Sequence, residues 1–220
     1  MKDFFKRVFT WLLLGVTFGG AYLHSMLLFM LLLLGIFLIV LLMEWPGLVP
    51  LEGLEAVLLS LLYPGLPMIG LLTLHGVFYA TDFYLPLYPF AVAWTADTFG
   101  YLVGKICGWH KIYPSISPGK SWQGLAGSVV GVCLLNWFML PKLGAKFAGI
   151  VSISPWWLSI AFSTILTVIA FLGGLLLSIL KRSKNLKDAG TLLPGHGGFL
   201  DRFDSVFAVV LVVWIMLLIK

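Results

Sequence analysis

Charged residues gather in one polar segment of this otherwise apolar chain, from Ser178 to Ser205. Asp201 and Asp204 stand three residues apart in it, so both carboxylates project from one face if the segment is helical. Paired carboxylates without a cysteine or histidine cluster suit a hard, oxygen-preferring ion such as Mg²⁺. Basic neighbours indicate that the metal's partner is a polyanion, with a surface network of salt bridges as the alternative. These neighbours are Lys181, Arg182, Lys187 and Arg202.

A further acidic residue, Asp97, lies inside the apolar run AVAWTADTFGYLVG. A charge at membrane depth costs at least ~2.5–3.5 kcal/mol, so an ionisable residue there is a functional candidate. The alternative is a structural role, in which Asp97 pairs with a lysine or a helix end. Asp97 is therefore a candidate functional residue.

Glycines surround a single histidine in the polar segment. Gly195, Gly197 and Gly198 permit positive φ angles and a close approach of backbone to a ligand, although a surface turn also uses glycine. His196 is a candidate for phosphate binding or acid catalysis; holding the loop geometry is its alternative role.

A second polar segment, from Ser115 to Gly127, reads SISPGKSWQGLAG and is predicted to be a loop. It lacks the GxxxxGK[ST] order of a phosphate-binding loop. Its serines and Lys120 could still bind phosphate, with Trp122 at the membrane interface.

The composition indicates a membrane protein. Of the 220 residues, 60% are hydrophobic and 10% are charged, against roughly 25% charged residues in soluble domains. Apolar runs are continuous rather than alternating, so their backbone groups must be satisfied in helices and not in a barrel. We predict an all-α polytopic membrane protein with a single membrane domain, residues 1–220. Cys107 and Cys133 form neither a disulfide framework nor a metal spacing, and nothing indicates nucleic-acid binding.

The apolar runs predict about seven membrane-spanning helices, with a range of six to nine. Pro64 and Pro67 should kink the third span. The N-terminal run continues without a clear small-residue cleavage site, so we expect a retained helix rather than a signal peptide. The predicted spans are 11–23, 26–43, 54–72, 85–103, 125–140, 156–180 and 206–219.

The distribution of basic residues predicts the orientation. With a cytoplasmic N-terminus, this layout places 11 of the 14 lysines and arginines on the cytoplasmic side. Both polar segments then face the compartment that holds nucleotides. We expect an inner (plasma) membrane protein whose active site lies on the cytoplasmic face.

The polar segment resembles the signature of the phosphatidate cytidylyltransferase (CDP-diacylglycerol synthase) family. Upstream motifs fit the same family in order, and the match covers about residues 94–207. The N-terminal helices, residues 1–80, match only as generic membrane helices, so residues 84–220 are expected to carry catalysis. The matching residues read Ala96-Asp97, Tyr101, Gly104-Lys105, Gly108, Ser117-Pro118-Gly119-Lys120-Ser121-Trp122-Gln123-Gly124, Ser178-x2-Lys181-Arg182-x4-Lys187-Asp188-x-Gly190 and Pro194-Gly195-His196-Gly197-Gly198-x2-Asp201-Arg202-x-Asp204-Ser205.

The resemblance implies a reaction in which phosphatidate and CTP give CDP-diacylglycerol and pyrophosphate, with Mg²⁺ required. CTP, phosphatidate and membrane lipid are the expected partners, and a second copy of the chain, in a homodimer, is a further candidate. The resemblance implies catalytic roles for Lys181, Arg182, Lys187, Asp188, His196 and Arg202, cofactor binding by Ser117, Lys120, Ser121, Gly195, Gly197 and Gly198, and metal binding by Asp97, Asp201 and Asp204.

One stretch departs from the family pattern. Before Ser178 the family usually reads Gly-Asp-Leu-x-Glu-Ser, whereas this chain has glycine at 174 and leucine at 177. Either Asp97, Asp188 or Asp204 replaces the missing metal ligand, or substrate phosphates and water hold the ion, or catalysis is weakened. Two other functions therefore stay open: a CTP-dependent enzyme acting on another lipid of the polyprenol type, and a non-catalytic family member.

Overall fold

The computed structural model describes residues 2–49, 52–143, 156–193 and 197–219, and the prediction of an all-α membrane protein is confirmed. Over this part of the chain, four helical segments are long and apolar enough to cross a membrane: Met26–Leu48, Gly53–Phe78, Trp122–Lys142 and Trp156–Ser183. The predicted spans 11–23, 85–103 and 206–219 fall on helices outside this group of four, the first of them on the shorter apolar stretch Leu12–His24. The total of seven spans stays a prediction.

The chain divides into two compact units, Met1–Tyr79 with Leu180–Phe203 and Ala80–Ile179 with Asp204–Lys220. Two helices, α9 (Trp156–Ser183) and α10 (Leu200–Leu218), each contribute residues to both units. The assignment of one membrane domain stays a prediction.

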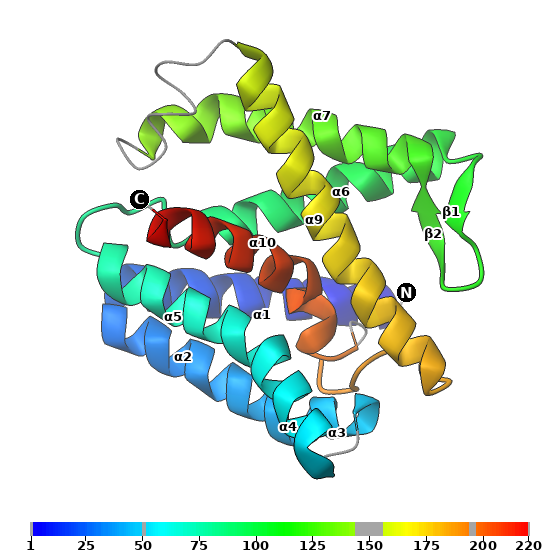
Figure 1. Cartoon of the computed structure of the whole chain (residues 1–220), viewed down its shortest axis with the longest axis horizontal. Helices are drawn as coiled ribbons and strands as arrows, with labels where there is room; N and C mark the ends of the chain where they lie inside the picture. Colours follow the sequence, from blue (N-terminus) through cyan, green and yellow to red (C-terminus); the bar gives the residue numbers. More distant parts are fainter. Residues whose placement is uncertain (1, 50–51, 144–155, 194–196, 220) are drawn as a thin grey trace. The chain divides into compact units, whose positions relative to one another are not determined.

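In the first unit, α1 (Lys2–His24) and α2 (Met26–Ile39) are separate helices, as predicted (Figure 1). Ser25 joins the two helices, and its hydroxyl accepts a hydrogen bond from Leu28 N and caps α2, so that α2 begins at the next residue. A π-helical turn (Val40–Glu44) and the short α3 (Trp45–Leu48) follow.

The predicted kink at Pro64 is confirmed. Helix α4 (Gly53–Ser60) leads into a π-helical turn (Leu61–Gly65) in which Tyr63 has extended φ/ψ angles of −152° and 112°. Helix α5 (Leu66–Phe78) continues beyond it and packs on α2. The residue before a proline disfavours the α-helical region, which explains the break at Tyr63.

In the second unit, α6 (Tyr88–Cys107) and α7 (Trp122–Met139) pack closely. Glycines let the two backbones approach: a Cβ on Gly127 would come within 2.5 Å of Val103 Cγ2, and one on Gly131 would overlap the Phe99 ring. Polar side chains connect these helices to α9. Tyr88 donates a hydrogen bond to Asn136, and Asn136 donates one to Ser163 (2.8 Å each).

The segment from Ser115 to Gly127, predicted to be a loop, instead forms regular structure. Strands β1 (Lys111–Tyr113) and β2 (Ser117–Ser121) form an antiparallel hairpin, and α7 begins at once after β2 (Figure 1). The Ser121 hydroxyl accepts a hydrogen bond from Gly124 N and caps α7, which explains this early helix start. The last predicted span also begins earlier, since α10 starts at Leu200 rather than 206.

The close approach of α6 and α7 makes a testable prediction. Gly131→Ala should destabilise the protein by about 1–3 kcal/mol, because the methyl group overlaps the Phe99 ring. The matched control is Gly35→Ala on α2, where a Cβ meets nothing within 4 Å and alanine favours the helix by about 1 kcal/mol. Thermal unfolding in detergent compares the two variants, and equal melting temperatures would contradict the packing described.

Candidate active site

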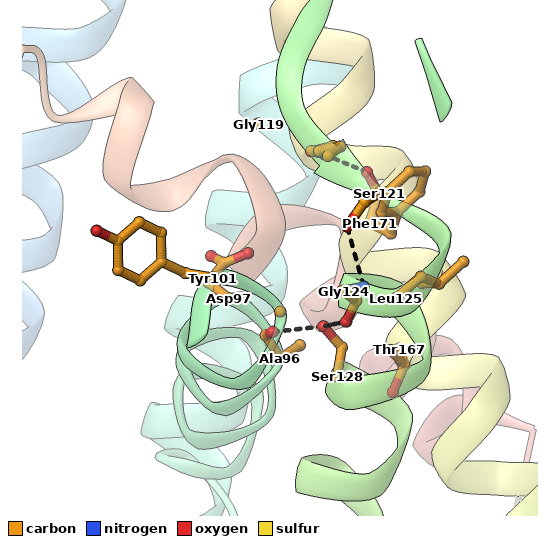
Figure 2. Close-up of a pocket in the computed structure, with 12 residues that line it drawn as sticks. Ala96, Asp97, Tyr101, Gly119, Ser121, Gly124, Leu125, Ser128, Thr167 and Phe171 are labelled. Carbon is orange, nitrogen blue, oxygen red and sulfur yellow. Dashed lines mark hydrogen bonds between the residues drawn. The ribbon is translucent and has the colours of Figure 1, made fainter. Parts of the chain in front are cut away.

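A cavity of about 200 Å³ in the second unit contains several of the predicted site residues. We call it the Asp97 pocket; α6, β2, α7 and α9 line it, as Figure 2 shows. Pockets for small molecules usually measure roughly 300–1,000 Å³, so this cavity matches a phosphate group and an ion better than a whole nucleotide. Its polar lining includes Asp97, Lys120, Ser121, Ser128 and Thr167.

Lys120 enters the Asp97 pocket from the end of β2. Its ammonium donates a hydrogen bond to the Phe171 carbonyl oxygen (2.9 Å) and lies 4.4 Å from the centre of the Phe171 ring. Both contacts stabilise a cation away from bulk water. The strand and α9 therefore hold a positive charge in the pocket.

Two acidic residues meet at the hydroxyl of Ser205, a buried residue of α10. This oxygen lies 3.5 Å from Oδ1 of Asp97 and 3.2 Å from Oδ1 of Asp204. Asp204 Oδ1 also accepts a hydrogen bond from Ser205 N (2.6 Å). The second unit thus brings together Asp97 and Asp204, which are 107 positions apart in the sequence.

Gly174 faces the same group of side chains. A Cβ at this position would lie 3.0 Å from Lys120 Nζ, 3.4 Å from Asp204 Oδ2 and 3.4 Å from Ser205 Oγ. An acidic side chain here would therefore enter the cluster of Lys120 and Asp204. Leu177, the other departure from the family pattern, is fully buried.

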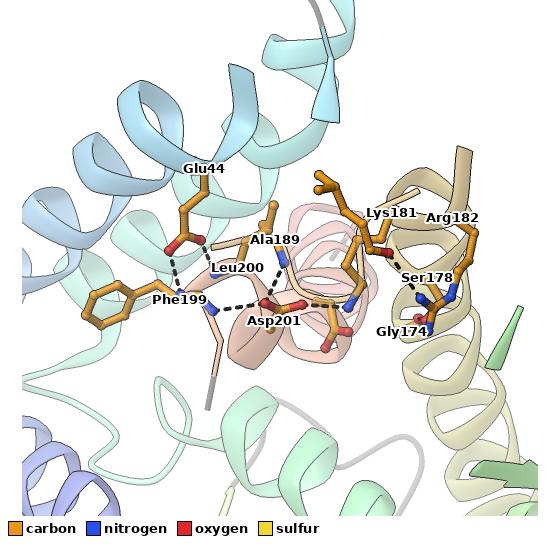
Figure 3. A network of polar contacts seen from close by, with 12 residues as sticks. Glu44, Gly174, Ser178, Lys181, Arg182, Ala189, Phe199, Leu200 and Asp201 are labelled. Carbon is orange, nitrogen blue, oxygen red and sulfur yellow. Dashed lines mark hydrogen bonds and ion pairs between the residues drawn. The ribbon is translucent and has the colours of Figure 1, made fainter. Parts of the chain in front are cut away.

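Asp201 organises a second set of contacts, all in the first unit (Figure 3). Its Oδ1 forms an ion pair with Lys181 Nζ at 2.6 Å, and its Oδ2 accepts hydrogen bonds from the backbone N–H groups of Ala189 (2.8 Å) and Gly198 (2.9 Å). We call these contacts the Asp201 clasp. The Asp201 side chain is 4% exposed, so the clasp satisfies a buried carboxylate with three donors.

The remaining predicted residues are placed less centrally. Arg182 donates a hydrogen bond to the Leu186 carbonyl (3.1 Å) and is exposed, as are Lys187, Asp188 and Arg202. Ser117 lies in β2 outside the lining of the pocket. Gly197 has a positive φ of 81°, consistent with the predicted need for glycine there. His196 and Gly195 lie outside the described residues.

Glu44 is a polar residue that sequence reasoning did not select. It is 1% exposed, and its two oxygens accept hydrogen bonds from the backbone N–H groups of Phe199 and Leu200 (2.8 Å each), as Figure 3 shows. A single acid at the end of the apolar run 26–43 was the available signal, but its partners lie about 155 residues away. Nothing in the local sequence identifies them.

Comparison with known proteins confirms the resemblance. Residues 2–220 match the profile described as the Cytidylyltransferase family. Proteins named phosphatidate cytidylyltransferase are similar in sequence: 37% identity over 136 residues in Haemophilus influenzae (62% of this chain, 44% of the relative), 37% over 144 residues in Staphylococcus haemolyticus (64% and 53%), and 40% over 122 residues in Mycobacterium leprae (56% and 36%).

The chain spans about half the length of the curated relatives that it matches, or less. The matching profile, in contrast, extends over the N-terminal helices as well as the polar segments. This chain, which contains the Asp97 pocket and the Asp201 clasp, therefore belongs to the cytidylyltransferase family.

Proposed function

We propose that this protein transfers CMP from CTP to phosphatidate, giving CDP-diacylglycerol and pyrophosphate for phospholipid synthesis. The observation that carries this proposal is the presence of Asp97 and Lys120 in one pocket, with Asp204 joined to Asp97 through the Ser205 hydroxyl, in a chain of this family. The names of the relatives support CTP and phosphatidate as substrates.

The reaction explains why the site needs positively charged side chains. A phosphate oxygen of phosphatidate attacks the α-phosphorus of CTP, and the bond from that phosphorus to the bridging oxygen of the β-phosphate breaks. Pyrophosphate leaves with the electron pair. Two polyanions must approach each other, so cationic groups have to offset their repulsion and the charge on the leaving group. The position of Lys120 in the pocket supports this role. The family resemblance supports the same role for Lys181 and for the exposed Arg182, Lys187 and Arg202.

Asp97 in the pocket and the neighbouring Asp204 together fit a magnesium ion. In the part of the chain that the structure describes, no three acidic, histidine or cysteine side chains gather as a complete metal site. Mg²⁺ is commonly held by one or two carboxylates together with substrate phosphates and water, and Asp97 with Asp204 supplies such a pair. When bound, the ion would neutralise phosphate charge. We assign Asp201 to the clasp first, because Lys181 and two backbone N–H groups occupy three of its acceptor positions.

The apolar helices support a lipid substrate that remains in the membrane. We propose that the acyl chains of phosphatidate stay in the bilayer while CTP arrives from the cytoplasm. The bias of lysines and arginines supports a cytoplasmic active site in the plasma membrane. A homodimer stays a prediction, which the mass of the purified protein in detergent tests.

A second candidate is a family member that binds nucleotide or lipid without turnover. The surroundings of Gly174 and Leu177 favour it, because neither position supplies a carboxylate and Lys120 lies where a side chain at 174 would enter. Transfer to another lipid phosphate or alcohol is distinguished by the acceptor supplied in the assay.

The assay combines purified protein, radiolabelled CTP and phosphatidate vesicles, with and without Mg²⁺. We expect a lipid-linked CMP product that requires Mg²⁺. Asp97→Asn and Asp204→Asn should each lower the rate by at least about tenfold, since each removes a charged metal ligand. Glu55→Gln, an exposed acid on α4, is the matched control and should keep the wild-type rate. Absence of product with every metal tested would favour the non-turnover candidate.

The position of Gly174 makes a separate prediction about metal affinity. Gly174→Asp adds a carboxylate beside Asp204 and Lys120, so Mn²⁺, used as a magnetic substitute for Mg²⁺, should bind severalfold more tightly. Gly174→Asn has nearly the same size without the charge and is the control. Titration followed by electron paramagnetic resonance measures both, and equal affinities would contradict a metal site next to Gly174.

A further inference from the structure

Glu44 stands out because a buried acid from the N-terminal helices contacts the beginning of α10. Each of its carboxylate oxygens accepts one hydrogen bond: Oε1 from Phe199 N and Oε2 from Leu200 N. The first N–H groups of a helix have no partner within it, and a negative charge at that end is favourable. Glu44 therefore performs the capping role for α10 from the other end of the first unit's sequence.

Two glycines make room for the Glu44 carboxylate. A Cβ on Gly198 would lie 2.6 Å from both of its oxygens, and one on Gly190 would lie 2.9 Å from Oε1. Any side chain at these positions would displace the acid. The absence of a side chain at Gly198 therefore lets the Glu44 carboxylate come close to the backbone, whereas the sequence predicted that a ligand would do so.

Glu44 and Asp201 hold the same stretch of backbone from two sides. Gly198 N donates to Asp201, while the next two N–H groups, of Phe199 and Leu200, donate to Glu44. Asp201 lies in the first turn of α10, so its direction depends on where that helix begins. Its Oδ1 in turn holds the ammonium of Lys181. A continuous set of contacts thus runs from Glu44 through the start of α10 to Lys181.

We propose that Glu44 is a positioning residue for the Asp201 clasp, and through it for the Lys181 cation in the reaction. The role in catalysis rests on the proposed CMP transfer; the role in positioning does not. The N-terminal helices then do more than span the membrane, because α2 and the turn after it deliver the acid that sets the start of α10.

Amide hydrogen exchange at single-residue resolution in detergent tests the positioning role without any substrate. In Glu44→Ala, exchange at Phe199 and Leu200 should become roughly 10- to 100-fold faster, because hydrogen bonds to a charged group are lost. The decisive amides are Ala189 and Gly198, which bond to Asp201 and not to Glu44. They should also exchange at least about tenfold faster if Glu44 positions the clasp. Faster exchange confined to Phe199 and Leu200 would overturn the proposal and leave Glu44 as a simple cap.

Two further variants keep the test decisive. Glu44→Gln retains one carbonyl oxygen as an acceptor and should give a smaller effect than alanine at all four amides. If Glu44→Ala fails to fold, faster exchange at Ala189 and Gly198 in Glu44→Gln supports the proposal, and unchanged exchange there overturns it. Glu55→Gln, an exposed acid in the same unit, should exchange as the wild type does. Unchanged exchange at Ala189 and Gly198 in Glu44→Gln and Glu44→Ala alike would overturn the proposal.

Kinetics separate this inference from the proposed function. In an active wild-type protein, Glu44→Gln should lower kcat by about tenfold and leave KM for CTP within about twofold, because the Asp97 pocket is unchanged. A normal kcat together with disturbed clasp amides would overturn the catalytic part. If the wild type makes no lipid-linked CMP, the proposed function and the catalytic part fail together, and exchange at Ala189 and Gly198 alone decides the positioning role.

Discussion

Buried carboxylates in a largely apolar chain must find their partners within the protein, and the contacts of Glu44 and Asp201 follow from that constraint. A buried carboxylate without hydrogen bonds or a counter-charge is costly. Asp201 meets this demand with Lys181 and two backbone N–H groups, and Glu44 meets it with two further N–H groups. Satisfying these acids fixes the path of the backbone into α10. The position at which α10 begins therefore depends on the hydrogen bonds that the backbone donates to Glu44 and Asp201.

The same constraint acts differently in the Asp97 pocket. Beside this pocket the Ser205 hydroxyl lies within hydrogen-bond distance of both Asp97 and Asp204, and Asp204 also accepts from Ser205 N. Lys120 is held by the carbonyl oxygen and ring of Phe171. The Asp201 carboxylate accepts from Lys181 and two backbone N–H groups, whereas Asp97 lines the same cavity as Lys120 and lies next to Asp204 through the Ser205 hydroxyl. This contrast underlies the division of labour that we propose between the two sets of acids.

Local sequence predicted the helices well where the apolar pattern alone decides them. The separate helices before and after Ser25 and the break at Pro64 follow from local chemistry. The early start of α10 was not predictable, because Glu44 caps it from about 155 residues away. The hairpin 111–121 was missed because its serine, proline and glycine content is typical of a loop. Among the site residues, the family pattern selected Asp97, Lys120 and Asp204, but it carries no signal for Glu44 or for the contact between Lys120 and Phe171.

We propose that Asp97 and Asp204, rather than Asp201, bind the metal that accompanies CTP. A crystal structure with CTP and Mn²⁺ tests it most directly, because anomalous scattering locates manganese independently of the model of the protein. We expect a manganese peak in coordinating contact with Asp97 and Asp204, with the ion pair of Lys181 and Asp201 intact. A peak on Asp201 with Lys181 displaced, and none beside Asp97 and Asp204, would contradict it.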